Sequence, residues 1–333
     1  MAISRQQLAK ELEPGLNALF GLEYKNYENQ HAEIFDTENS DRAFEEEVML
    51  SGFDKAGVKS EGAAVSYDNA QETFTARYQH ETIALAFSLT EENVEDNLYD
   101  KISTRYTKAL ARSMAQTKQT KAALVLDRAF NGTYTGGDGA TLCSGQTAGR
   151  SGGHPTIAGK FVNELLVSAD LSETSLEQCL IDIGAMTDER GLKIAANGMK
   201  LIIPSALQFT AERIMKSANR VGTADNDINA IKSKGMIPQG YVVNNFLTDT
   251  DAFFIKTDVP NGMKHMVRVP IKTAMEGDFE TGNMRYKARE RYSFGWSDPR
   301  GIFGSPGVLS LIHISEPTRL LSIGVGGVGV EKK

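Results

Sequence analysis

The sequence predicts an α+β subunit that is flat or elongated rather than round. Three patterns predict it: two strand-like runs within residues 46–89, an uninterrupted helical pattern over 91–130, and alternation of apolar and basic residues over 284–296. A helix of about 40 residues would be roughly 60 Å long, whereas a compact sphere of this chain would be only about 50 Å across. A round domain therefore cannot contain this helix.

Composition narrows the class of protein. The chain has 333 residues, with 36 basic and 43 acidic side chains and a net charge of −7. This balance argues against a protein whose main role is non-specific binding of nucleic acid. Two cysteines, Cys143 and Cys179, are too few for a disulfide framework or a cysteine-rich metal site. No apolar run reaches the length of about 18 residues that marks a membrane span, so we expect no membrane partner.

The first 89 residues suggest parts that need a partner. Residues 1–45 are polar and weakly patterned, and Pro14-Gly15 is expected to break any long helix there. We interpret this segment as an N-terminal arm, although a terminal helix of the same domain would fit equally well. Residues 46–89 hold extended runs around a tip rich in Gly, Ser and Ala, which predicts a long hairpin. Because such a hairpin has few residues to bury, we expect it to lie on a partner.

The helix over 91–130 begins with acidic residues and continues with basic ones, which suits the helix dipole, and Thr90 is its expected N-cap. A Gly-rich, irregular stretch follows at 131–160, and loops of this length are usually functional, disordered or clamped by a neighbour. The spacing of Thr174 and Glu177 predicts a capping box at the start of the next helix, whose apolar face includes Cys179. Residues 193–264 form a small α+β unit, after which strands resume.

Motifs for catalysis and for cofactor binding are missing. The sequence has no phosphate loop, no zinc-protease motif and no nucleophile elbow, and its five histidines show no metal-ligand spacing. A Gly-x-Gly-x-x-Gly match at 324–329 is not followed by the helix that dinucleotide binding requires. We therefore expect no enzyme activity, no cofactor and no metal.

Two sets of basic residues are candidates for a functional surface. The first, the helix stripe, has helical spacing and consists of Lys101, Arg105, Lys108 and Arg112. The second, the strand row, alternates with apolar residues and consists of Arg285, Lys287, Arg289 and Arg291. Each set could be a solvated face or could form salt bridges between subunits. The sharper hypothesis is contact with a polyanion on one side of an otherwise acidic protein.

Several segments resemble tailed-bacteriophage major capsid proteins. In chain order they are EGAAVSY at 61–67, FTARY at 74–78, EDNLY at 95–99, HP at 154–155, ADLSETSL at 169–176, DERGL at 188–192, LIIP at 201–204 and FTAERI at 209–214. The resemblance covers roughly residues 40–307 in the right order. It is therefore far more specific than any single motif.

The resemblance implies the Hong Kong 97-type fold. The implied parts are an N-terminal arm at 1–45, an extended hairpin loop at 46–89, a peripheral domain at 90–192 with its spine helix at 91–130, an axial domain at 193–264, and returning strands of the peripheral domain at 265–307. The implied function is structural: hexamers and pentamers form the icosahedral shell of a virion around packaged double-stranded DNA, assembled in the cytoplasm of a bacterial host.

The resemblance also implies assembly partners: a portal, a protease and a separate scaffold. About 45 residues before the hairpin leave no room for a scaffolding segment, which implies either a separate scaffold or prior cleavage. An encapsulin-like compartment around a cargo enzyme is the alternative, and a soluble enzyme without a recognised motif is a third hypothesis. Lys55 and Lys59 lie in the hairpin, but no motif assigns them a partner for the covalent cross-links that some members form.

The last part of the chain, 308–333, departs from the family. It resembles a translated sequencing-adapter read-through, so we expect it to be non-native; a genuine apolar tail that docks on a neighbour is the alternative.

Overall fold

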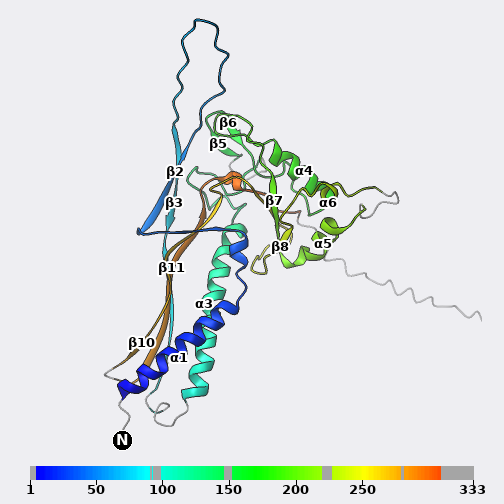
Figure 1. Cartoon of the computed structure of the whole chain (residues 1–333). Helices are drawn as coiled ribbons and strands as arrows, with labels where there is room; N and C mark the ends of the chain where they lie inside the picture. The colour runs from blue at the N-terminus through cyan, green and yellow to red at the C-terminus, as the bar shows by residue number, and fades with distance from the viewer. Residues whose placement is uncertain are drawn as a thin grey trace, which may run out of the picture.

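A computed structural model describes residues 5–90, 92, 99–145, 152–219, 227–278 and 281–308. Its helices are α1 (Arg5–Asn26), α3 (Tyr99–Asp127), α4 (Glu173–Gly184), α5 (Gln208–Lys216) and α6 (Ala230–Lys234), with 3-10 turns η1 (Gln30–Glu33), η2 (Ser205–Leu207) and η3 (Pro299–Gly301). Its strands are β1 (Asp36–Asn39), β2 (Phe44–Leu50), β3 (Glu72–Gln79), β4 (Glu81–Leu89), β5 (His154–Thr156), β6 (Gly159–Phe161), β7 (Gly198–Ile203), β8 (Tyr241–Val243), β9 (Phe253–Thr257), β10 (Met263–Gly277), β11 (Met284–Trp296) and β12 (Ile302–Ser305). These elements form an elongated leg, a body beside it and a hairpin that projects beyond both, so the expected elongated shape is confirmed (Figure 1).

The leg has two layers, with helices packed on a long sheet. The sheet has the order β1-β10-β11-β4; β10 is antiparallel to β11, β11 to β4, and β1 is parallel to β10. Strand β11 alternates as predicted, since Tyr286 and Ala288 are buried between exposed basic residues. These two side chains pack with Leu110 and Met114 of α3 and with Phe20 of α1. One apolar cluster thus joins both helices to the sheet.

The body is built around a second sheet, of order β12-β9-β7-β8. Helix α4 places Cys179 and Ile183 in its core, and α5 adds Ala211. Phe303 of β12 belongs to the same cluster, so the strand that follows the long sheet returns to the body. Cys179 is therefore a core residue, as its place on the apolar helix face predicts.

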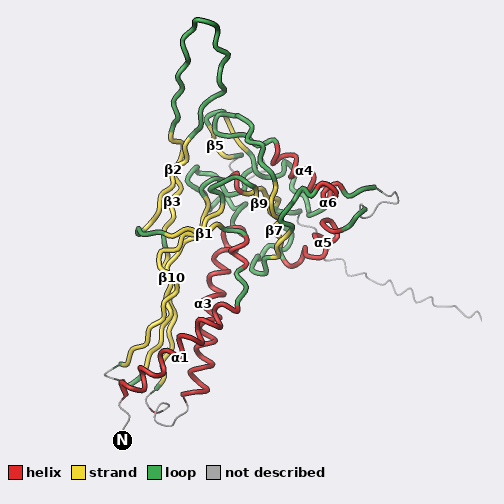
Figure 2. The backbone as a smooth tube through the Cα atoms, viewed as in Figure 1, coloured by secondary structure: helices red, strands yellow, loops and turns green. Residues whose placement is uncertain are grey.

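The hairpin consists of β2 and β3, which pair antiparallel below a tip at 51–71 (Figure 2). It is shorter than the predicted 46–89, because β4 pairs with β11 in the long sheet. Ile83 and Phe87 of β4 pack against the cluster between the sheet and α3, which explains why this run belongs to the leg. The two runs are separated by His80, where the chain passes from one sheet to the other.

Helix α1 continues through Pro14, so the prediction of a break at this residue was wrong. A proline inside a helix removes one backbone hydrogen bond and costs about 3 kcal/mol. Leu16 and Phe20 follow it and are buried against α3, and each contributes roughly 1.5–3 kcal/mol. Packing therefore outweighs the local penalty. These contacts are those of a terminal helix packed on its own subunit.

The starts of helices α3 and α4 bear on the two predicted helix caps. Helix α3 is described from Tyr99 onwards; the predicted turns at 93–98 lie outside the described residues, and the Thr90 cap stays a prediction. Helix α4 is capped two residues earlier than expected. Its capping box joins Ser172 and Ser175, whose side chains bond each other's backbone, rather than Thr174 and Glu177.

Candidate functional site

The hairpin tip exposes large apolar side chains in the single subunit. Phe53 is 62% exposed, Val65 63% and Tyr67 97%. Within the described chain, β2 and β3 pair only with each other, and an isolated pair of strands is marginally stable in water. Exposed apolar side chains on a projecting element mark a surface for protein contact. The geometry therefore supports the expectation that the hairpin lies on a partner.

A buried ion pair fixes the base of the hairpin to the leg. Lys264 of β10 is almost fully buried and contacts Glu47 of β2 and, at 3.1 Å, Glu38 of β1. Burial alone would lower the pKa of the Lys264 ammonium, but its hydrogen bonds to the two carboxylates outweigh burial and raise it. The base of the hairpin is thus held by charge as well as by backbone pairing.

A chain of hydroxyl groups gives a second attachment. The Tyr78 hydroxyl of β3 bonds Ser297, which in turn donates to Glu47 of β2. Gly295 lies against the Tyr78 ring: an added Cβ would come within 2.8 Å of a ring carbon. Both strands of the hairpin are therefore connected to the end of β11, and the direction in which the hairpin projects is set by side chains of the leg.

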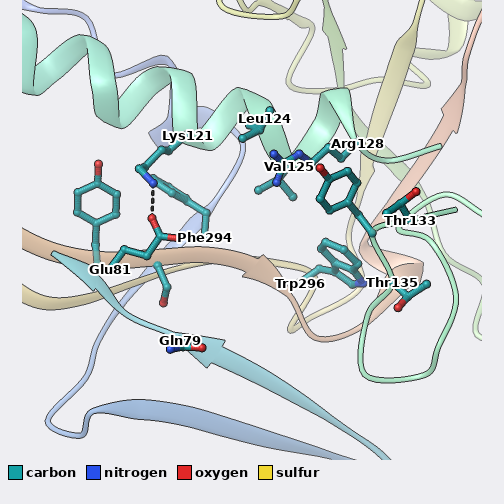
Figure 3. Close-up of a pocket in the computed structure, with 13 residues that line it drawn as sticks. Gln79, Glu81, Lys121, Leu124, Val125, Arg128, Thr133, Thr135, Phe294 and Trp296 are labelled. Atoms are coloured by element: carbon teal, nitrogen blue, oxygen red, sulfur yellow. Dashed lines mark hydrogen bonds and ion pairs between the residues drawn. The ribbon is translucent and has the colours of Figure 1, made fainter. Parts of the chain in front are cut away.

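A pocket of about 400 Å³ lies where α3 passes this base (Figure 3). At its rim Lys121 donates to Glu81, and the guanidinium of Arg128 lies 3.9 Å from the centre of the Tyr134 ring. Each of these charged groups therefore has a partner within the subunit. The apolar part of the lining is formed by Leu124, Val125, Phe294 and Trp296.

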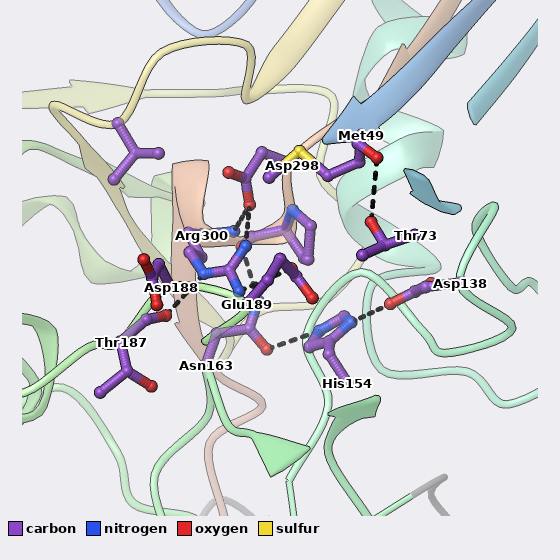
Figure 4. Close-up of polar contacts among 12 residues, drawn as sticks. Met49, Thr73, Asp138, His154, Asn163, Thr187, Asp188, Glu189, Asp298 and Arg300 are labelled. Carbon is purple, nitrogen blue, oxygen red and sulfur yellow. Dashed lines mark hydrogen bonds and ion pairs between the residues drawn. The ribbon is translucent and has the colours of Figure 1, made fainter. Parts of the chain in front are cut away.

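A buried polar network centred on Asn163 joins the Gly-rich loop to the body (Figure 4). The Asn163 amide nitrogen donates to the carbonyls of Leu142, Pro299 and Ile302, and its oxygen accepts from the backbone N–H of Ser144. This fixes the orientation of the amide, so its oxygen faces Nε2 of His154 at 3.1 Å. The network clamps the loop expected at 131–160.

Arg300 forms the second half of this network. Its guanidinium donates to Glu189 at 2.8 Å, to Asp298 at 3.2 Å and to the Thr187 carbonyl, and all three charged side chains are buried. Burial raises the pKa of Asp298, and the nearby Arg300 opposes this rise. These contacts join η3 to the segment that carries Thr187 and Glu189, so the network stabilises the fold.

The two basic sets lie on opposite surfaces of the leg. Tyr286 and Ala288 face α3, so the alternate residues Arg285, Lys287 and Arg289 point out from the other face of the sheet. On α3, the residues buried against the sheet and α1 leave Arg105, Lys108 and Arg112 exposed on the helical layer. Arg291 is half-buried, and the side chain of Lys101 lies outside the description.

The two surfaces differ in how their charges are compensated. Within the described residues, Arg105 and Lys108 have no ion-pair partner, and Arg112 lies 5.7 Å from the Tyr27 ring centre. In the strand row, Arg285 pairs with Asp278 at 2.5 Å and stands opposite Glu276 of β10. Lys287 and Arg289 have no ion-pair partner in the described chain either, so the helix stripe is the less compensated set by the one ion pair of Arg285.

The described residues offer little for catalysis. Cys143 and Cys179 are buried free thiols, and burial, with Asp182 nearby, raises the pKa of Cys179. In the part of the chain that the structure describes, no cluster of His, Cys, Asp or Glu is suited to a metal ion. No described helix is both long and apolar enough to cross a membrane.

Sequence reasoning missed the residues that fix the hairpin and the loop. Glu47 gave no signal, because the apolar Val48 and Leu50 predict the other face of the strand as the inward one, whereas in the structure Glu47 lies on the half-buried face. Asn163 and Arg300 carry no signal either, since their partners come from segments more than 100 residues away.

Comparison with known proteins agrees with this architecture. Residues 72–305, more than half of the chain, match the family described as phage capsid protein. The capsid of an empty GTA particle shares 14% identity over 84% of this chain and 90% of its own, with a TM-score of 0.52. The capsid of the native GTA particle has the same identity and coverage, with a TM-score of 0.50. A virus-like particle from Pyrococcus furiosus is 11% identical over 87% of this chain and 97% of its own, with a TM-score of 0.45.

No curated protein sequence matches the chain. The family match nevertheless spans the distal hairpin strand, the long helix, the clamped loop and both sheets, and the architecture agrees with it. The chain therefore belongs to the phage capsid protein family and has the Hong Kong 97-type fold.

Proposed function

We propose that this chain is the major head subunit of a tailed phage or prophage, forming hexamers and pentamers of an icosahedral shell around double-stranded DNA. The observation that carries the proposal is the projecting hairpin, whose apolar tip has no core of its own and whose base is held rigidly. Such a tip is suited to lie on a second copy of the chain. Assembly would take place in the bacterial cytoplasm with a portal, a separate scaffold and a protease.

Electron microscopy of the purified protein tests this proposal. We expect closed shells or capsomers, and we expect shortening of the tip at 51–71 to leave folded monomers, because the tip contributes nothing to the core of its own subunit. Monomers under all conditions, including co-expression with the scaffold gene, would contradict the proposal. The encapsulin-like alternative has less support, since the family match is to phage capsids. Shells filled with one cargo enzyme and free of DNA would favour it.

The positions of the helix stripe and the strand row bear on which surface of the subunit contacts DNA. A shell has one inner surface, and the two sets lie on opposite faces of a two-layer leg, so only one of them can face packaged DNA. We propose that it is the helix stripe, because its charges are the less compensated. The strand row would then lie on the outer face or between subunits.

Glutamine substitution of Lys101, Arg105, Lys108 and Arg112 should spare shell assembly but reduce the stability of DNA-filled heads. Each lost phosphate contact lowers the slope of the logarithm of the DNA-binding constant against the logarithm of salt concentration by about 0.9. For the full variant this slope should therefore fall by up to about 3–4. DNA release from filled heads, measured against salt concentration, checks this.

The matched control replaces Arg285, Lys287 and Arg289 with Gln, which removes a similar charge from the opposite face. Filled heads of this control should hold DNA as the parent does. If the control loses DNA and the helix variant does not, the faces are reversed. Loss of assembly in the helix variant would show that its charges form bridges between subunits.

We also propose that residues 308–333 are not native. The family match ends at 305, close to the point where the sequence stops resembling the family. Sequencing reads that cross codon 307 of the source DNA test this, since a continuous and well-covered junction would contradict it.

A further inference from the structure

Two buried histidines lie between the segment that follows α1 and the leg. His31 belongs to η1, and His265 belongs to β10; they are 6% and 4% exposed. Their rings meet edge to face with centroids 5.2 Å apart, and the His265 ring stacks on Phe294 at 4.4 Å. Thr37 of β1, the cross-strand neighbour of His265, contacts its Nδ1 at 3.3 Å.

Both rings are placed so that only the neutral form fits. His31 Nδ1 and His265 Nε2 are buried and have no hydrogen-bond partner in the described chain. A neutral imidazole can leave its acceptor nitrogen bare at modest cost, whereas an imidazolium must bury an additional N–H without an acceptor. Protonation of either ring therefore conflicts with the geometry of the closed state.

The surrounding charges increase this conflict. Lys118 of α3 is the nearest cation, and its ammonium lies 5.0 Å from the Tyr292 ring centre and 2.6 Å from Glu290 of β11. Glu290 is already paired with Lys118 and accepts from the Tyr24 hydroxyl of α1. The other polar groups that face the pair, Gln119 of α3, Thr37 of β1 and Tyr292 of β11, are neutral. Two new positive charges would thus add to that of Lys118, whose counter-charge Glu290 is engaged through Oε2 and has a buried Oε1 without a partner in the described chain.

We propose that His31 and His265 form an acid-operated latch, which holds residues 30–39 on the leg at neutral pH and releases them on acidification. These residues connect α1 to the hairpin, so release would uncouple the N-terminal helix from the hairpin base. The proposal concerns the single subunit and does not depend on the shell.

The ionisation of the two rings agrees with this geometry. Burial, aided by Lys118, lowers the pKa of His31 to about 4. Burial, with His31 and Lys118 nearby, lowers the pKa of His265 to about 3. Both rings return to about 6.5 when the segment opens and exposes them. Because the open form binds more protons below pH 6.5, acid favours opening.

The expected effect is on how steeply the opening constant of residues 30–39 depends on pH. Each ring should make the opening constant rise about 15-fold between pH 6.5 and 5, with the slope approaching tenfold per pH unit at the acid end, because half of the open form is already protonated at pH 6.5. Three carboxylates also hold the segment: Glu33 on Lys200, Asp36 on Lys256 and Glu38 on Lys264. The hydrogen bond from Lys200 lowers the pKa of Glu33. Because burial also raises the pKa of Glu290, the histidines are isolated by comparing the parent with variants that lack each ring over the interval from pH 6.5 to 5.

Hydrogen exchange of the amides at 31–39, corrected for the intrinsic pH dependence, measures the opening constant. The slope of the logarithm of the opening constant against pH counts the protons taken up on opening. Its size in this interval should be near two for the parent and near one for His31→Phe. It should be near zero for the double variant His31→Phe with His265→Phe. Phenylalanine keeps the aromatic packing on Phe294 and removes the titration. If the double variant does not fold, His31→Gln alone still predicts a slope near one.

Glu33→Gln is the matched control, since it weakens the same segment without removing a histidine. It should raise exchange at every pH of the interval and leave the slope near two. Equal slopes in the parent and in His31→Phe would overturn the latch. So would an NMR titration in which the His31 ring protonates near its ordinary pKa of about 6.5 in the closed state.

Discussion

Replacing Arg300 with Met is expected to lower the free energy of unfolding by about 4 kcal/mol, the largest loss among the single substitutions considered. Arg300 is 3% exposed and neutralises Glu189 and Asp298, which are buried as well. Methionine fills most of the volume but leaves two carboxylates in the interior without their counter-charge. It also leaves the Thr187 carbonyl without its donor.

Denaturant unfolding of the unassembled subunit measures this loss. For a chain of this size the midpoint of thermal unfolding should fall by roughly 6 °C. The matched control is Lys256→Met, which removes another ion pair, at 2.9 Å, whose partner Asp36 is exposed. That change should cost less than about 1 kcal/mol, because water screens the pair. Equal losses in the two variants would show that Arg300 is not an essential counter-charge.

The pH dependence of the Arg300→Met variant gives an independent check. In the native protein Arg300 opposes the upward shift that burial imposes on the pKa of Asp298. Without Arg300, that pKa rises further, so the folded variant binds protons more readily than its unfolded form. The stability difference from the parent should therefore narrow as pH falls from 7 to 5. A difference that is constant over this range would contradict the role assigned to the guanidinium.

The elements that the sequence predicted well are those that repeat a local pattern. The alternation in β11 and the helical spacing in α3 are properties of adjacent residues, and both elements form where the pattern indicates. Pro14 shows the limit of such reasoning. Its local penalty is real, but Phe20 packs on a helix some 90 residues away, and no local rule anticipates that contact.

In the candidate site, too, the sequence predicts what depends on neighbouring residues and misses what depends on packing. The basic residues could be named from the sequence because their spacing on each element is local. That the helix stripe and the strand row face opposite ways could not, because it depends on how α3 packs on the sheet. The attachments of the hairpin were also missed: Lys264 and Glu47 are separated by 216 intervening residues and belong to different sheets, so they meet only because the hairpin packs against the long sheet.

Replacing Gly137 with Ala is expected to displace the hairpin base and to reduce assembly more than it reduces folding. Gly137 lies in the clamped loop against β3, and an added Cβ would come within 2.2 Å of the Thr75 carbonyl oxygen and 2.6 Å of its carbon. Both are backbone atoms, so no side-chain rotation relieves the clash. The loop or the strand must move, at a cost of about 2–3 kcal/mol to the unassembled subunit.

The two outcomes can be separated by measuring unfolding and assembly on the same preparations. Gly277→Ala is the matched control, because Gly277 ends β10 with open space around it, and it should leave both quantities unchanged. The displacement of the hairpin occurs in every subunit of a closed shell, so its effect on assembly accumulates, whereas it affects the folding of a monomer only once. Folded Gly137→Ala monomers that fail to close shells would therefore show that this loop sets the direction of the hairpin. Normal shells from the same variant would mean that the tip finds its neighbour regardless of how its base is held.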